Sequence, residues 1–117
     1  MTASYDTASD RTVWDLAQHW ASTRPDAPML VSRSGVVSWG RYVDEVEVLR
    51  ARLAALGVAD QRTVVLALPN LPITLGLWLA ILANGGIVQA IDVDSGPIVV
   101  ERALAATNPA AVIVVPE

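Results

Sequence analysis

The pattern of hydrophobic and polar positions predicts, from residue 41 onward, helices that alternate with short strands. Apolar residues recur every three or four positions over residues 41–56, which is typical of one face of a helix. Short, largely apolar runs predict buried strands at residues 63–68, 87–91 and 111–115. Helices are expected between them, over residues 71–83 and 97–106. This alternation indicates an α/β fold of three layers, a mostly parallel sheet with flanking helices and right-handed crossovers.

The first forty residues are predicted to form a helix and a hairpin. Thr12 and Asp15 have the spacing of a capping box, in which a hydroxyl and a carboxylate satisfy free amide donors at a helix start. One apolar face follows, formed by Val13, Leu16, Ala17 and Trp20. Pro25 should end the helix, and Ser34–Gly35 separates two short apolar runs as in a hairpin. Residues 1–11 are expected to be a flexible leader, followed by one domain over residues 12–117.

Special residues mark the ends of the later elements. Gly57 and the pair Gly85–Gly86 each follow a predicted helix, where a glycine stops helical structure. Asn70 is predicted to cap the helix at 71–83, and Pro72 suits its first turn. That helix is apolar nearly all round, so it should be buried on more than one side.

A long uncharged stretch raises the question of a membrane span. No charged residue lies among the 29 residues between Arg62 and Asp92. Prolines, asparagines and glycines divide this stretch, and no arginine cluster flanks it, so the pattern favours buried elements of a folded domain. The N-terminus lacks a positive segment followed by an apolar one, and a cytoplasmic location is therefore expected.

Composition excludes several kinds of chemistry. The chain has 117 residues, a net charge of −4 and a pI near 4.8, which argues against binding to nucleic acid. Without cysteine, it has no disulfide, thiolate metal site or thiol nucleophile. His19 is the single histidine, and all 8 basic residues are arginine, so no lysine can form a Schiff base or grip a phosphate. Arginine without lysine, with much Ala and Val, suggests a bacterial GC-rich genome.

The candidate chemical groups lie where the predicted strands end, since ligands of open α/β sheets bind there. Asp92 and Asp94 could hold a divalent cation or a ribose, although such residues more often cap a helix or face water. Asn70 suits a cap better than a ligand contact, and Gly85–Gly86 precedes a strand, unlike a phosphate loop. Solvated positions are expected for His19 and for the acidic run Asp44, Glu45 and Glu47. Core positions are expected for the four tryptophans, Trp14, Trp20, Trp39 and Trp78. No constellation specifies a reaction, so no catalytic residue and no metal ligand is predicted.

Five motifs in order resemble the opening of the adenylate-forming enzymes: the acyl- and aryl-CoA synthetases, the luciferases and the adenylation domains of peptide synthetases. They are Thr12–Leu16 (TVWDL), Arg24–Leu30 (RPDAPML), Ser38–Trp39 with Leu56–Val58 (LGV), Arg62–Asn70 (RTVVLALPN) and Leu79–Gly86 (LAILANGG). The resemblance extends from Thr12 to Val115. Two segments, Asp60–Arg62 and Asp92–Asp94, depart from the family pattern and leave the subfamily open.

The resemblance implies an N-terminal α/β subdomain that stops before the phosphate loop. In the family, a carboxylate and ATP give an acyl-adenylate and pyrophosphate, usually with Mg²⁺, and a thiol such as that of CoA then takes the acyl group. The phosphate loop, the acidic ligands of ribose and Mg²⁺, and the lysine of the C-terminal lid lie further downstream. ATP, Mg²⁺ and CoA are therefore implied for a complete enzyme, and no cofactor is assigned to this chain.

Three functional hypotheses follow from these observations. The first is the N-terminal portion of an acyl- or aryl-CoA ligase, inactive alone, whose partner is the remainder of the ligase. The second is a non-enzymatic partner that completes or regulates a split adenylate-forming enzyme. The third is a small flavodoxin-like or receiver domain, which would need a lysine that the chain lacks. Exposed apolar surface of the isolated piece would favour a homodimer.

Overall fold

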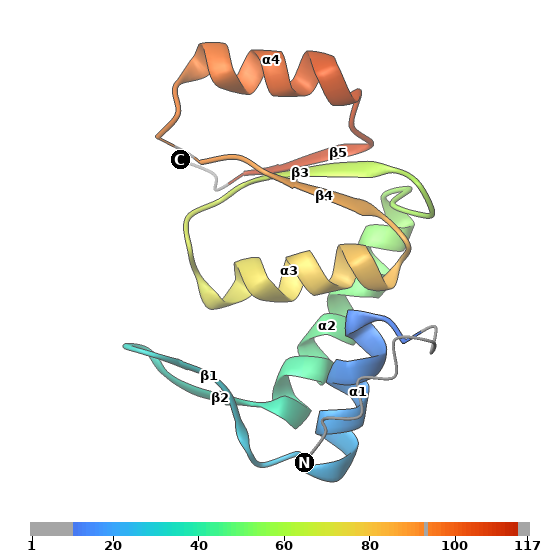
Figure 1. Cartoon of the computed structure of the whole chain (residues 1–117), viewed down its shortest axis with the longest axis vertical. Helices are drawn as coiled ribbons and strands as arrows, with labels where there is room; N and C mark the ends of the chain where they lie inside the picture. The colour runs from blue at the N-terminus through green and yellow to red at the C-terminus, as the bar shows by residue number, and fades with distance from the viewer. Residues whose placement is uncertain (1–10, 93, 115–117) are drawn as a thin grey trace.

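The computed structural model describes residues 11–92 and 94–114. Its four helices and five strands follow one another in the order drawn in Figure 1. They are α1 (Val13–Thr23), β1 (Pro28–Ser32), β2 (Gly35–Ser38), α2 (Trp39–Ala55), β3 (Thr63–Ala67), α3 (Pro72–Ala83), β4 (Ile87–Ala90), α4 (Pro97–Thr107) and β5 (Ala111–Val114). The alternation of helices and strands predicted from residue 41 onward is confirmed. Apart from Arg11, the predicted leader lies outside the described residues.

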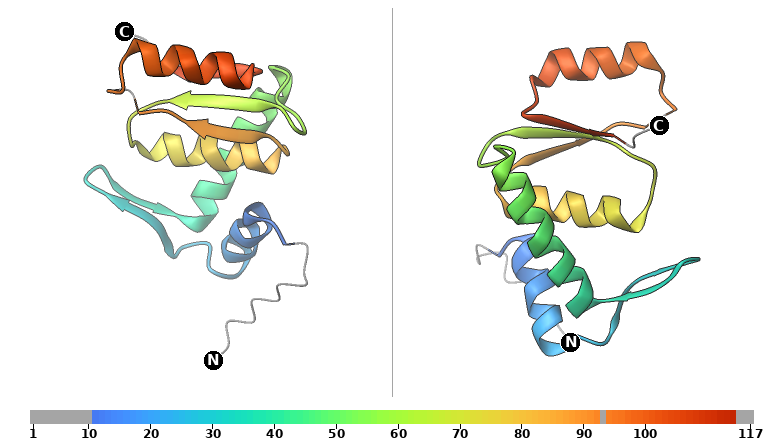
Figure 2. Two further views of the ribbon diagram at one scale, coloured as in Figure 1. Left: turned by 45° about the horizontal axis from the view of Figure 1, so that its top comes forward. Right: turned by 180° about the vertical axis from the view of Figure 1, so that it is seen from behind.

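The central sheet is parallel and has the strand order β4-β3-β5. Val65 in the middle strand lies opposite Gln89 of β4 and Val112 of β5. The chain moves from β3 to one side through α3, and from β4 to the other side of β3 through α4. Because such crossovers are right-handed, the two helices lie on opposite faces of the sheet, as Figures 1 and 2 show. The predicted three-layer α/β fold is confirmed.

The main core lies between the sheet, α3 and α2. Val46 of α2, Val64 and Leu66 of β3, and Ile81 of α3 are almost completely buried in it. By contrast, none of the residues of α4 is buried in the described structure. The core therefore holds one face of the sheet firmly to α3, while the face toward α4 is more open.

The N-terminal segment forms the predicted helix and hairpin. The Thr12 hydroxyl accepts from the Asp15 amide at 3.1 Å and the Thr12 amide donates to the Asp15 carboxylate at 3.0 Å, which is the predicted capping box. Strands β1 and β2 pair antiparallel. The predicted apolar face of α1 is only partly right, because Trp14 is buried with Ala17, whereas Val13 and Trp20 are exposed.

Two helix starts differ from the sequence prediction. Helix α2 begins at Trp39, not at residue 41, because the Ser38 hydroxyl caps it by accepting from the Arg41 amide at 3.2 Å. Asn70 does not cap α3; the N-cap position belongs to Leu71, which makes no side-chain capping bond. Asn70 lies one residue too early, because the helix starts at Pro72.

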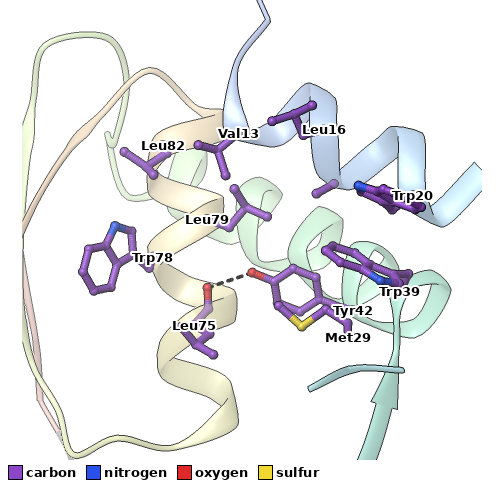
Figure 3. A pocket seen from close by; sticks show the side chains of 11 residues that line it. Val13, Leu16, Trp20, Met29, Trp39, Tyr42, Leu75, Trp78, Leu79 and Leu82 are labelled. Atoms are coloured by element: carbon purple, nitrogen blue, oxygen red, sulfur yellow. Dashed lines mark hydrogen bonds between the residues drawn. The ribbon is translucent and has the colours of Figure 1, made fainter. Parts of the chain in front are cut away.

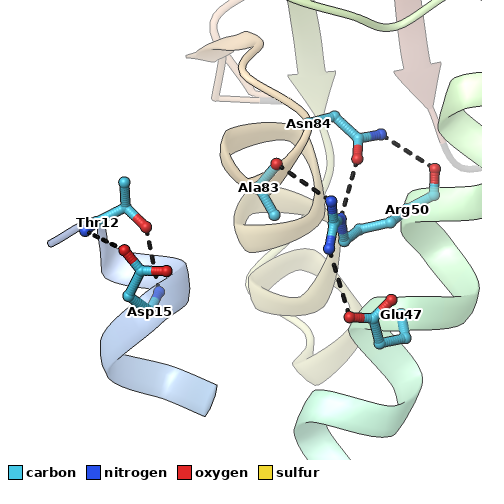
Figure 4. A network of polar contacts seen from close by, with 6 residues as sticks. All are labelled: Thr12, Asp15, Glu47, Arg50, Ala83 and Asn84. Carbon is cyan, nitrogen blue, oxygen red and sulfur yellow. Dashed lines mark hydrogen bonds and ion pairs between the residues drawn. The ribbon is translucent and has the colours of Figure 1, made fainter. Parts of the chain in front are cut away.

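A polar clasp joins α2 to the C-terminal end of α3 (Figure 4). The Arg50 guanidinium donates to the Asn84 side-chain oxygen at 3.0 Å, and the Asn84 amide donates back to the Arg50 carbonyl at 3.0 Å. The same guanidinium lies 5.2 Å from the centre of the Trp14 ring. Glu47 accepts from it at 3.4 Å. These contacts tie α1, α2 and α3 into one unit.

Candidate functional site

A cleft opens at the carboxyl ends of β3 and β4. The connection after β3 leads to α3 on one face of the sheet, and the connection after β4 leads to α4 on the other face. Such a switch point is where open α/β sheets place ligands. The cleft has a volume of about 460 Å³, and it is lined by Leu66, Leu68, Pro69, Asn70, Thr74, Trp78, Ala90, Ile91, Asp92 and Asp94.

The structure brings three of the sequence candidates, Asn70, Asp92 and Asp94, to this cleft. All three are exposed. Asp92 uses one carboxylate oxygen locally, because that oxygen accepts from the Asp94 amide at 2.9 Å. Among the described residues, no group of three or more His, Cys, Asp or Glu side chains could hold a metal ion. The arrangement is a turn with two acidic side chains, and it offers no complete set of metal ligands.

A second hollow, the apolar groove, lies between α1, α3 and the start of α2 (Figure 3). Its volume is about 470 Å³. Its lining consists of Val13, Leu16, Ala17, Trp20, Met29, Trp39, Tyr42, Leu75, Trp78, Leu79 and Leu82. The Tyr42 hydroxyl donates to the Leu75 carbonyl at 3.1 Å and so joins α2 to α3 at the floor of the groove. None of the described residues that line it is charged.

The four tryptophans divide between core and surface. Trp14 is buried, as expected for a core residue, and Trp39 is partly buried. Trp20 stacks on Trp39 with ring centres 6.4 Å apart, and Arg24 lies 5.4 Å from the Trp20 ring centre. Trp20 and Trp78 are exposed, so placing all four tryptophans in the core was wrong.

The remaining candidates have structural surroundings. His19 is exposed and meets Trp20 edge-on at 5.8 Å. Asp44, Glu45 and Glu47 lie on the exposed face of α2, where Glu45 pairs with Arg41 at 3.2 Å. Gly85 has a φ of +80°, and its amide donates to the Leu82 carbonyl at 2.9 Å. Gly85–Gly86 therefore ends α3, as predicted.

Sequence reasoning missed the link between Tyr42 and Leu75 and the groove above it. Tyr42 was readable as part of an apolar face of its helix, but its partner lies 33 residues further along the chain. The sequence did contain one signal for the groove. Helix α3 is apolar nearly all round, and a single packing partner covers only one side of a helix.

Burial raises the pKa of Tyr42 to about 12 from its ordinary value of 10.0. The folded chain thus holds the phenolic proton more tightly than the unfolded chain, and the resulting stability is fully present below pH 10. It should be lost as the pH rises from about 10 to about 12. Urea unfolding followed across this range should show the loss in the parent chain. In Tyr42→Phe this part of the pH dependence should be missing, and an unchanged alkaline loss would contradict the assignment.

Known proteins resemble this chain in sequence. The chain matches the AMP-binding enzyme family over residues 17–117. It is 35% identical over 75 residues to the 2-succinylbenzoate–CoA ligase of Salmonella typhimurium, a match that covers 64% of this chain and 16% of that ligase. The chain therefore spans a small part of the length of this relative.

Solved structures share the fold at low sequence identity. The complex of VinN with L-aspartate superposes with a TM-score of 0.86 at 20% identity, over 92% of this chain and 30% of VinN. The Klebsiella oxytoca NpsA N-terminal subdomain, in complex with 3-hydroxybenzoyl-AMSN, gives a TM-score of 0.82 at 17% identity, over 92% of this chain and 28% of that subdomain. A putative long-chain-fatty-acid CoA ligase from Rhodopseudomonas palustris gives 0.83 at 20% identity, over 90% of this chain and 27% of that protein.

The three-layer α/β architecture is thus that of the N-terminal subdomain of adenylate-forming enzymes. The family match covers most of the chain, and the protein belongs to the AMP-binding enzyme family.

Proposed function

We propose that this chain is the N-terminal structural portion of an ATP-dependent acyl- or aryl-CoA ligase. The observation that carries the proposal is the family match over residues 17–117, which agrees with the order of the five motifs. The identity to a CoA ligase adds support for thioester formation as the second half-reaction. The complete enzyme would join a carboxylate to the α-phosphate of ATP, release pyrophosphate, and transfer the acyl group to the CoA thiol with release of AMP.

The cleft at the ends of β3 and β4 offers little to a nucleotide or to Mg²⁺. None of the described residues that line it is basic, and one carboxylate oxygen of Asp92 already accepts from the Asp94 amide. No residue of this chain is therefore assigned to adenylation or thioester formation. Its role is to supply the sheet and helices against which the catalytic portion packs. A cytoplasmic location and the absence of nucleic-acid partners stay predictions.

The isolated 117-residue chain is expected to catalyse no exchange of labelled pyrophosphate into ATP, with any carboxylic acid tested. The physical reason is that the groups which stabilise charge on the reacting phosphates would lie outside it. The control is the product of the complete reading frame that contains these 117 codons, which should catalyse the exchange with its own acid. Exchange by the pure short chain would contradict the proposal.

A further inference from the structure

Helix α4 buries far less of its surface than α3, the helix on the opposite face of the sheet. Four residues of α3 are buried, whereas none of the residues of α4 is. Ile98 and Val99, in the first turn of α4, are 65% and 49% exposed. Of the described helices, α4 alone lies on its face of the sheet, as Figures 1 and 2 show. Its inner face is formed by partly buried side chains, which are Val100, Ala103, Leu104 and Thr107.

Polar side chains do not join α4 to any other element among the described residues. The Thr107 hydroxyl donates to the Ala103 carbonyl at 2.8 Å, so this hydrogen bond stays within the helix. The N-cap residue is Gly96, which makes no side-chain capping bond. By contrast, the Tyr42 hydroxyl and the Arg50 guanidinium both donate to groups of α3 or its C-cap. Helix α4 is therefore held to the sheet by the apolar contacts of its inner face.

The sheet surface under α4 contains a buried polar atom. Gln89, Val65 and Val112 are aligned across the three strands, so their side chains share one face of the sheet. Val64 and Leu66 point to the opposite face and belong to the core with α3, so the aligned row faces α4. The side-chain oxygen of Gln89 is buried in this layer, and no described protein group donates a hydrogen bond to it.

This buried oxygen weakens the attachment of α4. A carbonyl oxygen that leaves water without gaining a donor in the protein loses hydrogen-bond energy. Water reaches the Gln89 oxygen fully when α4 moves away, so opening restores hydrogen bonds that closing removes. The opposing effect comes from Val65, which is completely buried under the closed helix and would be exposed by opening. Because the two effects oppose each other, the closed position of α4 is only weakly favoured.

The segment that contains α4 is fixed to the middle strand at both ends. The Ile91 amide donates to the Leu66 carbonyl at 2.8 Å, and the Ala110 amide donates to the Thr63 carbonyl at 2.8 Å. Strands β4 and β5, on the two sides of the helix in the sequence, both pair with β3. The helix can therefore leave the sheet while all three strands stay paired.

We propose that α4 is a separately opening helix, which leaves the sheet between its two fixed ends while the rest of the described structure stays folded, and that Gln89 keeps its attachment weak. Elements with few buried apolar contacts are the ones that open below the free energy of global unfolding. The proposal concerns the 117-residue chain itself and does not depend on the proposed function.

Native-state hydrogen exchange of the 117-residue chain, followed by NMR amide by amide, tests the proposal. After division by the rates of unfolded peptides, the amides of residues 101–107 in α4 should exchange at least about a hundredfold faster than those of residues 79–83 in α3. This comparison is made within one chain and needs no variant. Equal protection of the two helices would overturn the proposal, because α4 would then open only when the whole chain unfolds.

Two conservative variants separate the contributions of the two faces of the sheet. Gln89→Met removes the amide at nearly constant size and should slow exchange in α4 about tenfold. Ile81→Val is the matched control, since Ile81 is completely buried in α3 on the other face. It should speed exchange in α3 about fivefold and leave α4 unchanged, because the closed and open forms of α4 lose the same contact.

Unchanged or faster exchange of α4 in Gln89→Met would overturn the role of Gln89. Faster exchange of both helices by the same factor in Ile81→Val would overturn separate opening, because it would show that α3 and α4 open together.

Discussion

Replacing Leu66 by alanine should lower the free energy of unfolding by about 3 kcal/mol, the usual cost of truncating a buried leucine. Leu66 lies in β3, the middle strand of the sheet, and is only 2% exposed. It packs in the core with residues of α3, so the substitution leaves a cavity between the sheet and that helix. Urea unfolding monitored by tryptophan fluorescence measures the change.

The matched control is Leu56→Ala, at the C-terminal cap of α2. Leu56 is 68% exposed, so the same change of side chain should cost less than about 0.5 kcal/mol. A loss at Leu66 no larger than the loss at Leu56 would show that the sheet does not form the core of the isolated chain.

Replacing Gly85 by alanine should cost about 3 kcal/mol through two separate effects. Gly85 has a φ of +80°, a region that side chains other than glycine rarely adopt. A Cβ atom there would also collide with the side chain of Asp60. The exposed Asp60 side chain would have to rotate away, or the loop before β3 would have to move from the end of α3, and urea unfolding of the variant measures the cost.

Gly57→Ala isolates the first of these effects. Gly57 has a similar φ of +87°, but a Cβ atom at this position meets nothing within 4 Å. It should cost about 1 kcal/mol, the penalty for the left-handed conformation alone. Removing the Asp60 side chain together with Gly85→Ala should recover most of the difference between the two glycine variants. Equal costs at both glycines would refute the steric part of the explanation.

Local sequence signals predicted the order of the elements because each signal acts within a few residues. Thr12 and Asp15 form a capping box at their own spacing, and Gly85 ends α3 through its own backbone conformation. The predicted helix starts were less accurate, because more than one polar residue near a helix start can act as its cap. Ser38 is the N-cap of α2, whereas Asn70 lies one residue before the N-cap of α3.

The candidate site could be predicted in part. The switch-point rule correctly brought Asn70, Asp92 and Asp94 to one cleft, because it needs only the order and direction of strands. The apolar groove and the Arg50–Asn84 clasp join residues more than 30 positions apart, so no local pattern contains them. The expectation that α3 is buried on more than one side is confirmed, because this helix packs against the sheet and against α2, although Leu75 and Trp78 stay partly open.

We propose that these 117 residues are the opening part of a longer adenylate-forming enzyme, and the coding frame beyond Glu117 in the source DNA can be read to test this. We expect a frame that continues for several hundred codons, through a loop rich in Ser, Thr and Gly that ends in Pro-Lys, to a late lysine. A stop codon directly after Glu117 would contradict the proposal, and a separate chain would then have to supply the active site.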